Sequence, residues 1–346
     1  MSLSSRLVSR LMKLPPAETH RYSVRRDVAV TMPDGVMLLA DHYTPYDAGK
    51  PDAAGGRRQY PTVFVRSPYG RRGFFAWIMA LPFVTHGYQV FLQSCRGTAG
   101  SGGPFVYARN EHSDGLATLV WMRQQPWYSG AVAMAGPSYL GFVQWAVAAE
   151  AGDDLKALVP SITASDFNHF RYQGGSLNLE TALGWSTMMT EQAATGPRFA
   201  DLLTTGRRRR RLEKAYAYLP LDQADRIVVQ QPSESFQDQL AHGPDDPHWQ
   251  PVNFSDRVGE VTAPVSLQAG WYDIFLDAQL ADYQRLRAAG RQPTLLIGPW
   301  YHGQMSSIPV MARDTLVWFD THLKGKQNSL QAKPVRLFVM GADTWR

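Results

Sequence analysis

The sequence contains a single cysteine, Cys95, among its 346 residues. One thiol excludes a disulfide within the chain, and it favours a reducing, cytoplasmic compartment over an oxidising one. The sequence also lacks any run of roughly 18 or more apolar residues, so we expect no membrane-spanning helix. Residues 1–20 have neither a continuous apolar core nor a cleavage site of small residues, and we therefore predict no secretory signal.

Neither positively nor negatively charged residues are in large excess. The formal net charge is +5, and the five consecutive arginines Arg207–Arg211 could account for all of it. We interpret this run as a solvated helix face in an insertion. A nucleic-acid patch is the alternative, but no interleaved aromatic residues or nucleic-acid motif support it, so we expect no nucleic-acid partner. No cluster of Cys and His indicates a metal site, and we expect no metal ion or other cofactor.

The stretch 130–142, Gly-Ala-Val-Ala-Met-Ala-Gly-Pro-Ser-Tyr-Leu-Gly-Phe, is the centre of the chain's organisation. An apolar run of strand length leads to Ser138 between glycines, and an apolar segment of helical length follows to about Glu150. This pattern is typical of a nucleophile elbow, in which a strand delivers a serine to a sharp turn before a helix. The motif departs from Gly-x-Ser-x-Gly, because Leu140 takes the second glycine's place and Gly141 follows it. Alone, such a string is weak evidence.

Strands and helices alternate on both sides of this stretch, which predicts an α/β fold with a mostly parallel sheet flanked by helices. The predicted helices are 74–86, 111–124, 276–289 and 311–323, and the predicted strands are 24–31, 36–44, 61–66, 88–94, 155–162, 264–269 and 293–297. Residues 166–248 have helical periodicity and predict an inserted helical cap. The α/β domain is then 24–165 and 249–334, preceded by an N-terminal extension over 1–23.

A serine hydroxyl needs a base to take its proton and a carboxylate to orient that base. In this fold the partners follow later strands, in the order Ser, Asp or Glu, His. Asp273 and His302 end two such strands after the insertion. Asp273 could instead cap the next helix, and Asp277 is the rival acid, although it lies inside that helix. His322 also follows the acid, but it sits late in a helix where it complements the helix dipole.

An oxyanion needs at least two hydrogen-bond donors. The backbone N–H of Tyr139, directly after the serine, is one candidate. Tyr69 ends an early predicted strand at Ser67-Pro68-Tyr69-Gly70, and its phenol is the second candidate. A turn tyrosine without a catalytic role is the alternative interpretation of Tyr69.

Together these motifs resemble the CocE/NonD hydrolases, relatives of the X-Pro dipeptidyl-peptidases, cocaine esterase and the α-amino-acid ester hydrolases. The resemblance covers roughly residues 24–341. Its elements are Met32-Pro33-Asp34-Gly35, Arg66-Ser67-Pro68-Tyr69-Gly70, Arg96-Gly97 with the Gly/Ser loop after it, Gly136-Pro137-Ser138-Tyr139-Leu140-Gly141, Gly270-Trp271-Tyr272-Asp273 and Gly298-Pro299-Trp300-Tyr301-His302-Gly303.

The resemblance implies an α/β-hydrolase fold in which Ser138 is the nucleophile, His302 the base and Asp273 its orienting acid. It implies an oxyanion hole formed by the Tyr69 hydroxyl and the Tyr139 amide, and a helical cap near residues 166–248. Ser67 departs from the family pattern, because an acidic residue is common there. Such proteins usually continue into a C-terminal jelly-roll domain, and we expect 335–346 to be the start of one that the chain does not contain.

The expected function is hydrolysis of a small ester or amide through an acyl-enzyme intermediate, as in carboxylesterases. Five aromatic residues could line an apolar acyl pocket: Trp185, Phe167, Phe170, Tyr172 and Trp271. X-Pro dipeptidyl-peptidase or α-amino-acid ester hydrolase activity is the alternative, and it would require a group such as Asp166 or Glu180 to hold a free ammonium. A further alternative is a non-catalytic α/β-hydrolase module that binds a ligand. The sequence does not indicate the oligomeric state.

Overall fold

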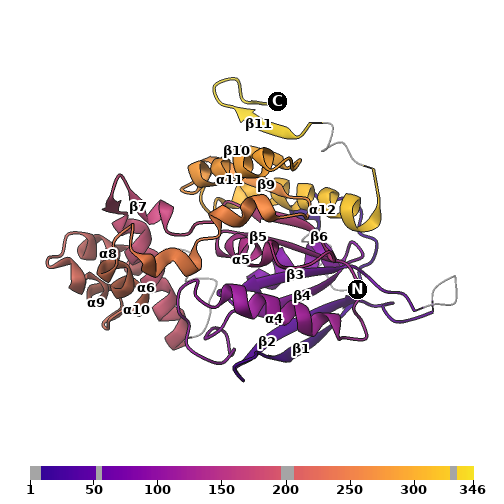
Figure 1. The fold of residues 1–346 in the computed structure, drawn as a ribbon, viewed down its shortest axis with the longest axis horizontal. Helices are drawn as coiled ribbons and strands as arrows, with labels where there is room; N and C mark the ends of the chain where they lie inside the picture. The colour runs from indigo at the N-terminus through magenta and orange to yellow at the C-terminus, as the bar shows by residue number, and fades with distance from the viewer. Residues whose placement is uncertain (1–8, 52–56, 196–205, 328–332) are drawn as a thin grey trace.

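The computed structural model describes residues 9–51, 57–195, 206–327 and 333–346 (Figure 1). Parts of the predicted N-terminal extension (1–8), of the loop after the first hairpin (52–56), of the cap (196–205) and of the segment before the last strands (328–332) lie outside the described residues. No helix in the described residues is both long and apolar enough to cross a membrane.

Within the described residues, the centre of the molecule is a ten-stranded sheet with the order β1-β2-β4-β3-β5-β6-β9-β10-β11-β12. Neighbouring strands from β4 to β11 run parallel, whereas β1, β2 and β12 pair antiparallel. The strands are β1 (Tyr22–Thr31), β2 (Met37–Pro45), β3 (Thr62–Ser67), β4 (Gln89–Ser94), β5 (Val132–Pro137), β6 (Leu155–Ser161), β9 (Ser266–Tyr272), β10 (Thr294–Tyr301), β11 (Val335–Val339) and β12 (Thr344–Trp345).

Helices cover both faces of this sheet. They are α2 (Phe74–Met79), α3 (Leu81–Val84), α4 (Glu111–Arg123), α5 (Tyr139–Ala148), α11 (Leu276–Ala288) and α12 (Ile308–Lys324), with 3₁₀ turns η4 (Ser255–Glu260) and η5 (Met305–Ser307). Strands β3 and β4 are buried along their whole length, as central parallel strands must be when both faces are covered. Every residue of α5 is buried, so the helix that follows the elbow is part of the core.

The predicted α/β fold is confirmed, and most element boundaries agree within three residues. The helix predicted over 74–86 is wrong in one respect, because it is two helices with a break at Ala80. Pro82 lies in the first turn of α3, a position that proline tolerates, whereas the interior of one continuous helix would not accommodate it. The strand β11, in the segment expected to open a further domain, pairs in parallel with β10 and extends the main sheet.

The inserted segment forms a group of helices on one side of the sheet (Figure 1). It comprises η1 (His169–Arg171), the two-stranded β7 (Tyr172–Gln173) and β8 (Ser176–Leu177), α6 (Leu179–Thr195), α8 (Gly206–Tyr216), η2 (Leu221–Gln223), α9 (Ala224–Val229), α10 (Glu234–Ala241) and η3 (Pro247–Val252). These helices enclose a small apolar core of their own, made of Ala182, Leu183, Leu212, Ala215, Ala224, Val228 and Phe236.

Candidate active site

Ser138 lies at the sharp turn between β5 and α5. Its backbone has φ 57° and ψ −123°, a region that residues other than glycine rarely occupy. The surrounding chain holds this conformation: the Ser138 N–H donates to the carbonyl of Ser161 at 2.9 Å, and the Thr163 hydroxyl donates to the carbonyl of Ser138 at 2.7 Å. The turn therefore presents the serine side chain at the carboxyl edge of the sheet.

Two glycines near this turn leave room for neighbouring side chains that pack closely against the backbone. A Cβ on Gly136 would lie 2.4 Å from Cβ of Leu140, and a Cβ on Gly141 would lie 2.4 Å from Cγ2 of Thr163. The position that must lack a side chain on the helix side is thus 141. The departure of the motif at Leu140 has a structural reason, because Leu140 packs over Gly136 while Gly141 faces Thr163.

Asp273, His302 and Ser138 form a continuous hydrogen-bonded chain. Nε2 of His302 lies 3.1 Å from Oγ of Ser138, and Nδ1 of His302 lies 2.9 Å from Oδ2 of Asp273. The other carboxylate oxygen of Asp273 accepts the N–H of Phe275 at 2.9 Å. The Asp273 carboxylate is almost fully buried, with 1% of its side chain exposed. This geometry places a donor on Nδ1 and leaves Nε2 able to accept the serine proton.

The two rival residues lie elsewhere. Asp277 is exposed in the first turn of α11, where a carboxylate complements the helix dipole. His322 packs against Trp318 on α12 at a ring distance of 4.2 Å, and its half-buried position lowers its pKa. Neither residue lines the cavity at Ser138.

Tyr69 and Tyr139 both lie at Ser138, Tyr69 with its side-chain hydroxyl and Tyr139 with its backbone N–H. The Tyr69 hydroxyl lies beside Ser138 and accepts the indole N–H of Trp185 at 3.1 Å. Burial raises the pKa of Tyr69 to about 12, so the phenol stays protonated at neutral pH and can donate. The Tyr139 N–H is in the first turn of α5, where backbone N–H groups have no acceptor within the helix.

The Tyr139 side chain lines the cavity, and its hydroxyl anchors the elbow to Ala108 and Glu111. Its hydroxyl donates to Glu111 at 2.8 Å and accepts the N–H of Ala108 at 3.1 Å. Burial raises the pKa of this phenol well above its usual range. Glu111 in turn pairs with the fully buried Arg66 at 2.6 Å. Removing one partner of such a buried pair leaves an uncompensated charge, so this network fixes the base of the elbow.

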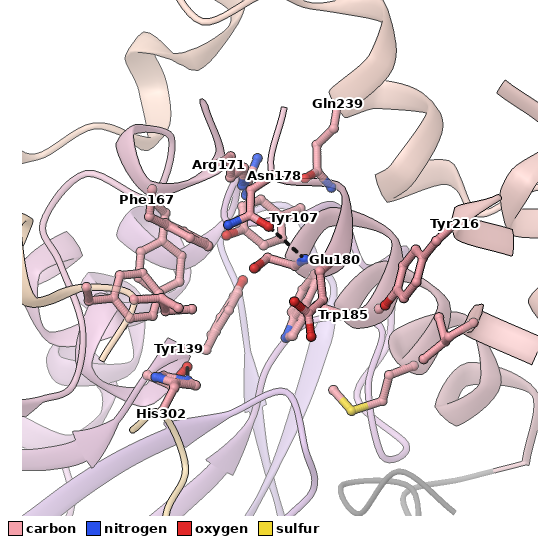
Figure 2. Close-up of a pocket in the computed structure, with 18 of the residues that line it drawn as sticks. Tyr107, Tyr139, Phe167, Arg171, Asn178, Glu180, Trp185, Tyr216, Gln239 and His302 are labelled. Atoms are coloured by element: carbon pink, nitrogen blue, oxygen red, sulfur yellow. Dashed lines mark hydrogen bonds between the residues drawn. The ribbon is translucent and has the colours of Figure 1, made fainter. Parts of the chain in front are cut away.

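A cavity of about 720 Å³ opens above Ser138 and His302, between the sheet edge and the inserted helices. Figure 2 shows His302 and Tyr139 at one end of it, with Gln239 and Tyr216 toward the cap helices. Its lining includes Tyr69, Tyr107, Phe167, Phe170, Arg171, Glu180, Trp185, Arg208, Arg209, Glu213 and Phe275. A cavity of this size is suited to a small molecule with an apolar group.

Three of the five predicted pocket aromatics line this cavity: Trp185, Phe167 and Phe170. The other two do not. The Tyr172 hydroxyl donates to the carbonyls of Gln239 and His242, and it lines a different hollow on the cap. The Trp271 indole donates to the carbonyl of Phe338 at 2.7 Å, so this side chain is bound to β11 at the far end of the sheet.

The two acidic candidates for binding an ammonium are also separated. Glu180, at the start of α6, lines the cavity. Asp166 lies in the other hollow and accepts the side-chain amide of Asn253 at 3.2 Å. The periodicity of the sequence could not show that only Glu180 faces the cavity. The chain between Asp166 and Glu180 passes through η1 and the two-stranded β7–β8 ribbon, so no single helical period connects them.

The cavity also contains charges that the sequence analysis missed. The arginine run is predicted to be a solvated helix face, and Arg207, Arg209 and Arg210 of α8 are exposed as expected. Arg208 is the exception, with 11% of its side chain exposed, and both Arg208 and Arg209 line the cavity. Arg208 pairs with Glu191 at 2.9 Å, and Arg209 pairs with Glu213 at 2.9 Å. The signal was available in principle, because Leu212 follows one helical turn later and is buried against the cap core.

The sheet order, the elbow and the hydrogen-bonded Ser-His-Asp chain define an α/β hydrolase. Comparison with known proteins assigns the family within this class. A family model described as X-Pro dipeptidyl-peptidase (S15 family) matches residues 34–304, and the chain belongs to this family. The resemblance recognised in the sequence motifs is thereby confirmed.

Among curated proteins, the chain is 33% identical to cocaine esterase of Rhodococcus sp. (strain MB1 Bresler). The alignment covers 94% of this chain and 59% of the esterase.

Solved structures show the same fold. An aminopeptidase from the marine sediment archaeon Thaumarchaeota archaeon has a TM-score of 0.72 and 20% identity, over 96% of this chain and 59% of that one. A CocE/NonD family hydrolase from Staphylococcus aureus has a TM-score of 0.68 and 18% identity, over 93% of this chain and 55% of that one. The chain thus spans less than two thirds of the length of these proteins.

Proposed function

We propose that the chain is a serine hydrolase that cleaves an ester or amide bond of a small molecule through an acyl-enzyme. The observation that carries the proposal is the hydrogen-bonded chain Ser138–His302–Asp273 opening into the cavity. Membership of the S15 family and the identity with an esterase support the same reaction class. A cytoplasmic location belongs to the proposal as well, on the ground of the buried, unpaired Cys95.

In the first half-reaction, His302 Nε2 takes the proton of Ser138 Oγ as this oxygen attacks the substrate carbonyl. Negative charge then develops on the carbonyl oxygen, and the Tyr69 hydroxyl and Tyr139 N–H are its proposed donors. His302 next gives its proton to the leaving alcohol or amine. Asp273 holds the ring in the correct tautomer and stabilises the imidazolium.

In the second half-reaction, water occupies the place that the leaving group has vacated and attacks the acyl carbonyl. His302 takes a proton from the water, and the same donors hold the second oxyanion. The Ser138 ester then breaks, and His302 returns the proton to Oγ. The proposed cap, residues 166–248, supplies Phe167, Phe170 and Trp185 as an apolar wall for the acyl group.

The test is labelling by a fluorophosphonate probe, compared between the wild-type chain and Ser138→Ala, followed by hydrolysis of p-nitrophenyl esters. We expect rapid labelling of the wild type, none of Ser138→Ala, and loss of nearly all ester hydrolysis in the variant. A folded, monodisperse wild type that does not label would contradict the proposal.

One observation favours a second candidate, hydrolysis of substrates with a free amino group. Glu180 lines the cavity and offers a carboxylate for a substrate ammonium. Glu180→Gln should then reduce kcat/KM for Gly-Pro-p-nitroanilide or an α-amino-acid ester by tenfold or more and spare p-nitrophenyl butyrate. The matched control is Glu213→Gln, because Glu213 also lines the cavity but already pairs with Arg209. An equal effect of Glu180→Gln on both substrate types would eliminate ammonium recognition at this residue.

A further inference from the structure

Three potential metal ligands meet on the cap, away from Ser138. One ligand atom from each of Asp238, His242 and His248 lies within 4.8 Å of the others. Asp238 lies in α10, and His242 is the first residue after the helix, where the backbone becomes extended. His248 comes from η3, where the chain leaves the cap. The two imidazole rings are parallel, with an interplanar angle of 3° and centroids 3.7 Å apart.

The hydrogen bonds around His242 leave a lone pair that faces a carboxylate. Nδ1 of His242 lies 3.0 Å from Oδ2 of Asp246, so this nitrogen carries the proton and donates it. In the neutral ring, Nε2 then has no proton, yet it lies 3.7 Å from Oδ1 of Asp238. Nε2 of His248 lies 3.0 Å from Oδ2 of the same carboxylate. Both imidazole rings are thus directed at Asp238.

A cation between these atoms removes the conflict between lone pair and carboxylate. A single divalent ion neutralises the carboxylate and accepts both imidazole lone pairs. It therefore satisfies all three side chains at once.

We propose that Asp238, His242 and His248 bind a divalent transition-metal ion of the Zn²⁺ type. Imidazole with one carboxylate suits Zn²⁺, whereas Ca²⁺ and Mg²⁺ prefer oxygen ligands alone. In a tetrahedral zinc site with bonds near 2.1 Å, neighbouring ligand atoms lie about 3.4 Å apart. The observed separations of 3.0 and 3.7 Å lie on either side of this value. The ligand side chains are 25–31% exposed, so water can take the fourth position.

Asp246 completes the site without touching the ion. Its bond to Nδ1 of His242 is the carboxylate–histidine arrangement that orients a metal ligand and raises its basicity. The sequence alone does not predict a metal site here. The ligand spacing Asp-x₃-His-x₅-His contains no cysteine, and η3 brings His248 against His242 only in the folded cap.

The ion would connect α10 to the segment that returns to the α/β domain. Trp249 packs edge-on against His248 at a ring distance of 4.7 Å and donates to the carbonyl of Gly243. Gln239, the residue after Asp238, lines the cavity. Metal binding should therefore stabilise the cap and one wall of the cavity. Only this last consequence for the cavity rests on the proposed hydrolase function.

The test is titration of the metal-stripped, full-length chain with ZnCl₂ by isothermal calorimetry. We expect one Zn²⁺ per chain with a micromolar dissociation constant and a rise in Tm of a few degrees at saturation. His242→Ala and His248→Ala should each weaken binding at least tenfold, and Asp246→Asn should weaken it by about tenfold or more. His112→Ala is the matched control, because His112 pairs with Glu150 on the α/β domain. Its affinity should equal that of the wild type.

Substitution with CoCl₂ supplies a second readout, since tetrahedral Co²⁺ gives visible absorption bands that the two histidine variants should lose. Circular dichroism establishes that the variants fold. Unchanged Zn²⁺ affinity in a folded His242→Ala/His248→Ala variant would overturn the proposal, as would no binding at millimolar ZnCl₂. Calorimetry does not depend on Ser138. Intact Zn²⁺ binding without fluorophosphonate labelling would therefore refute the hydrolase function alone.

Discussion

The indole N–H of Trp185 donates to the hydroxyl of Tyr69 at 3.1 Å, and this bond joins the cap helix α6 to the loop after β3. Because the Tyr69 oxygen accepts this bond, its own proton is free to point toward Ser138. Helix α6 therefore helps to orient the proposed oxyanion donor, in addition to contributing Trp185 to the wall of the cavity.

The first prediction concerns this bond. Trp185→Phe should lower kcat for p-nitrophenyl butyrate by about 5- to 10-fold, because a hydrogen bond of about 1 kcal/mol no longer orients the phenol. Tyr69→Phe should lower kcat by about 10²–10³-fold, because it removes the donor itself. In the Tyr69→Phe background, Trp185→Phe should have little further effect on kcat. Trp77→Phe is the control, since Trp77 is an exposed tryptophan on α2. Fully additive losses in the double variant would show that Trp185 acts independently of Tyr69.

The second prediction separates the two candidate acids. Asp273→Asn should reduce the rate of fluorophosphonate labelling by about 10⁴-fold, because an amide no longer selects the tautomer with Nδ1–H. Asp277→Asn should label at the wild-type rate, because Asp277 is exposed at the start of α11 and does not contact His302. Both rates are measured by quenching the labelling reaction at successive times and quantifying the labelled protein by in-gel fluorescence. The assignment fails if Asp277→Asn is the slower of the two.

The third prediction concerns Gly141, the glycine that lies one residue after its usual place in the Gly-x-Ser-x-Gly motif. Gly141→Ala should destabilise the fold by about 1–3 kcal/mol, because its methyl group would overlap the Thr163 side chain. Thr163 also holds the Ser138 carbonyl, so the rate of hydrolysis should fall together with stability. Chemical denaturation and p-nitrophenyl ester hydrolysis measure the two effects.

Gly184→Ala is the matched control for this overlap. It changes a glycine within α6 whose added Cβ would lie 3.7 Å from its nearest neighbour, an ordinary contact. Its stability should be equal to or slightly above that of the wild type, because alanine favours helix. Equal destabilisation by the two variants would refute the steric explanation.

The fourth prediction concerns pH. His42 is buried against Trp127 and bonds to Gln89 at 2.9 Å, and burial lowers its pKa to about 4. The unfolded histidine, with a pKa near 6.5, binds more protons than the folded one between these two values. The free energy of unfolding should therefore fall as pH falls from about 6.5 to 4, by about 3 kcal/mol in all.

Urea denaturation of the wild type and His42→Asn between pH 4 and 7.5 checks this prediction. The variant lacks the titrating group, so its stability should depend less on pH across this window, even if it is less stable at pH 7.5. An identical slope for the wild type and His42→Asn would contradict the burial argument.

The parts of the site set by local pattern and chain order could be predicted. The elbow was predictable because a strand, a turn and a helix follow one another within 130–148. Asp273 and His302 were predictable because parallel strands bring their carboxyl ends to one edge of the sheet, and both residues end such strands. The same rule identified Tyr69, which follows β3.

Contacts between the cap and the sheet could not be predicted. Trp185 was one of five candidate aromatics, and only the packing of α6 brings it to Tyr69. Tyr172 and Trp271 form hydrogen bonds elsewhere. The positions of Arg208 and Arg209 at the cavity also depend on how α8 packs against the other helices, because Leu212 and Ala215 form its buried side.

The sequence by itself determined the α/β fold and the order of the three catalytic candidates, since both follow from periodicity and from residues at strand ends. Only the tertiary structure decided which cap side chains face the cavity, why Gly141 rather than residue 140 must be glycine, and that Asp238, His242 and His248 meet. These relationships depend on how helices pack across long sequence separations. Such packing reflects the shape of many side chains at once, and no local pattern carries it.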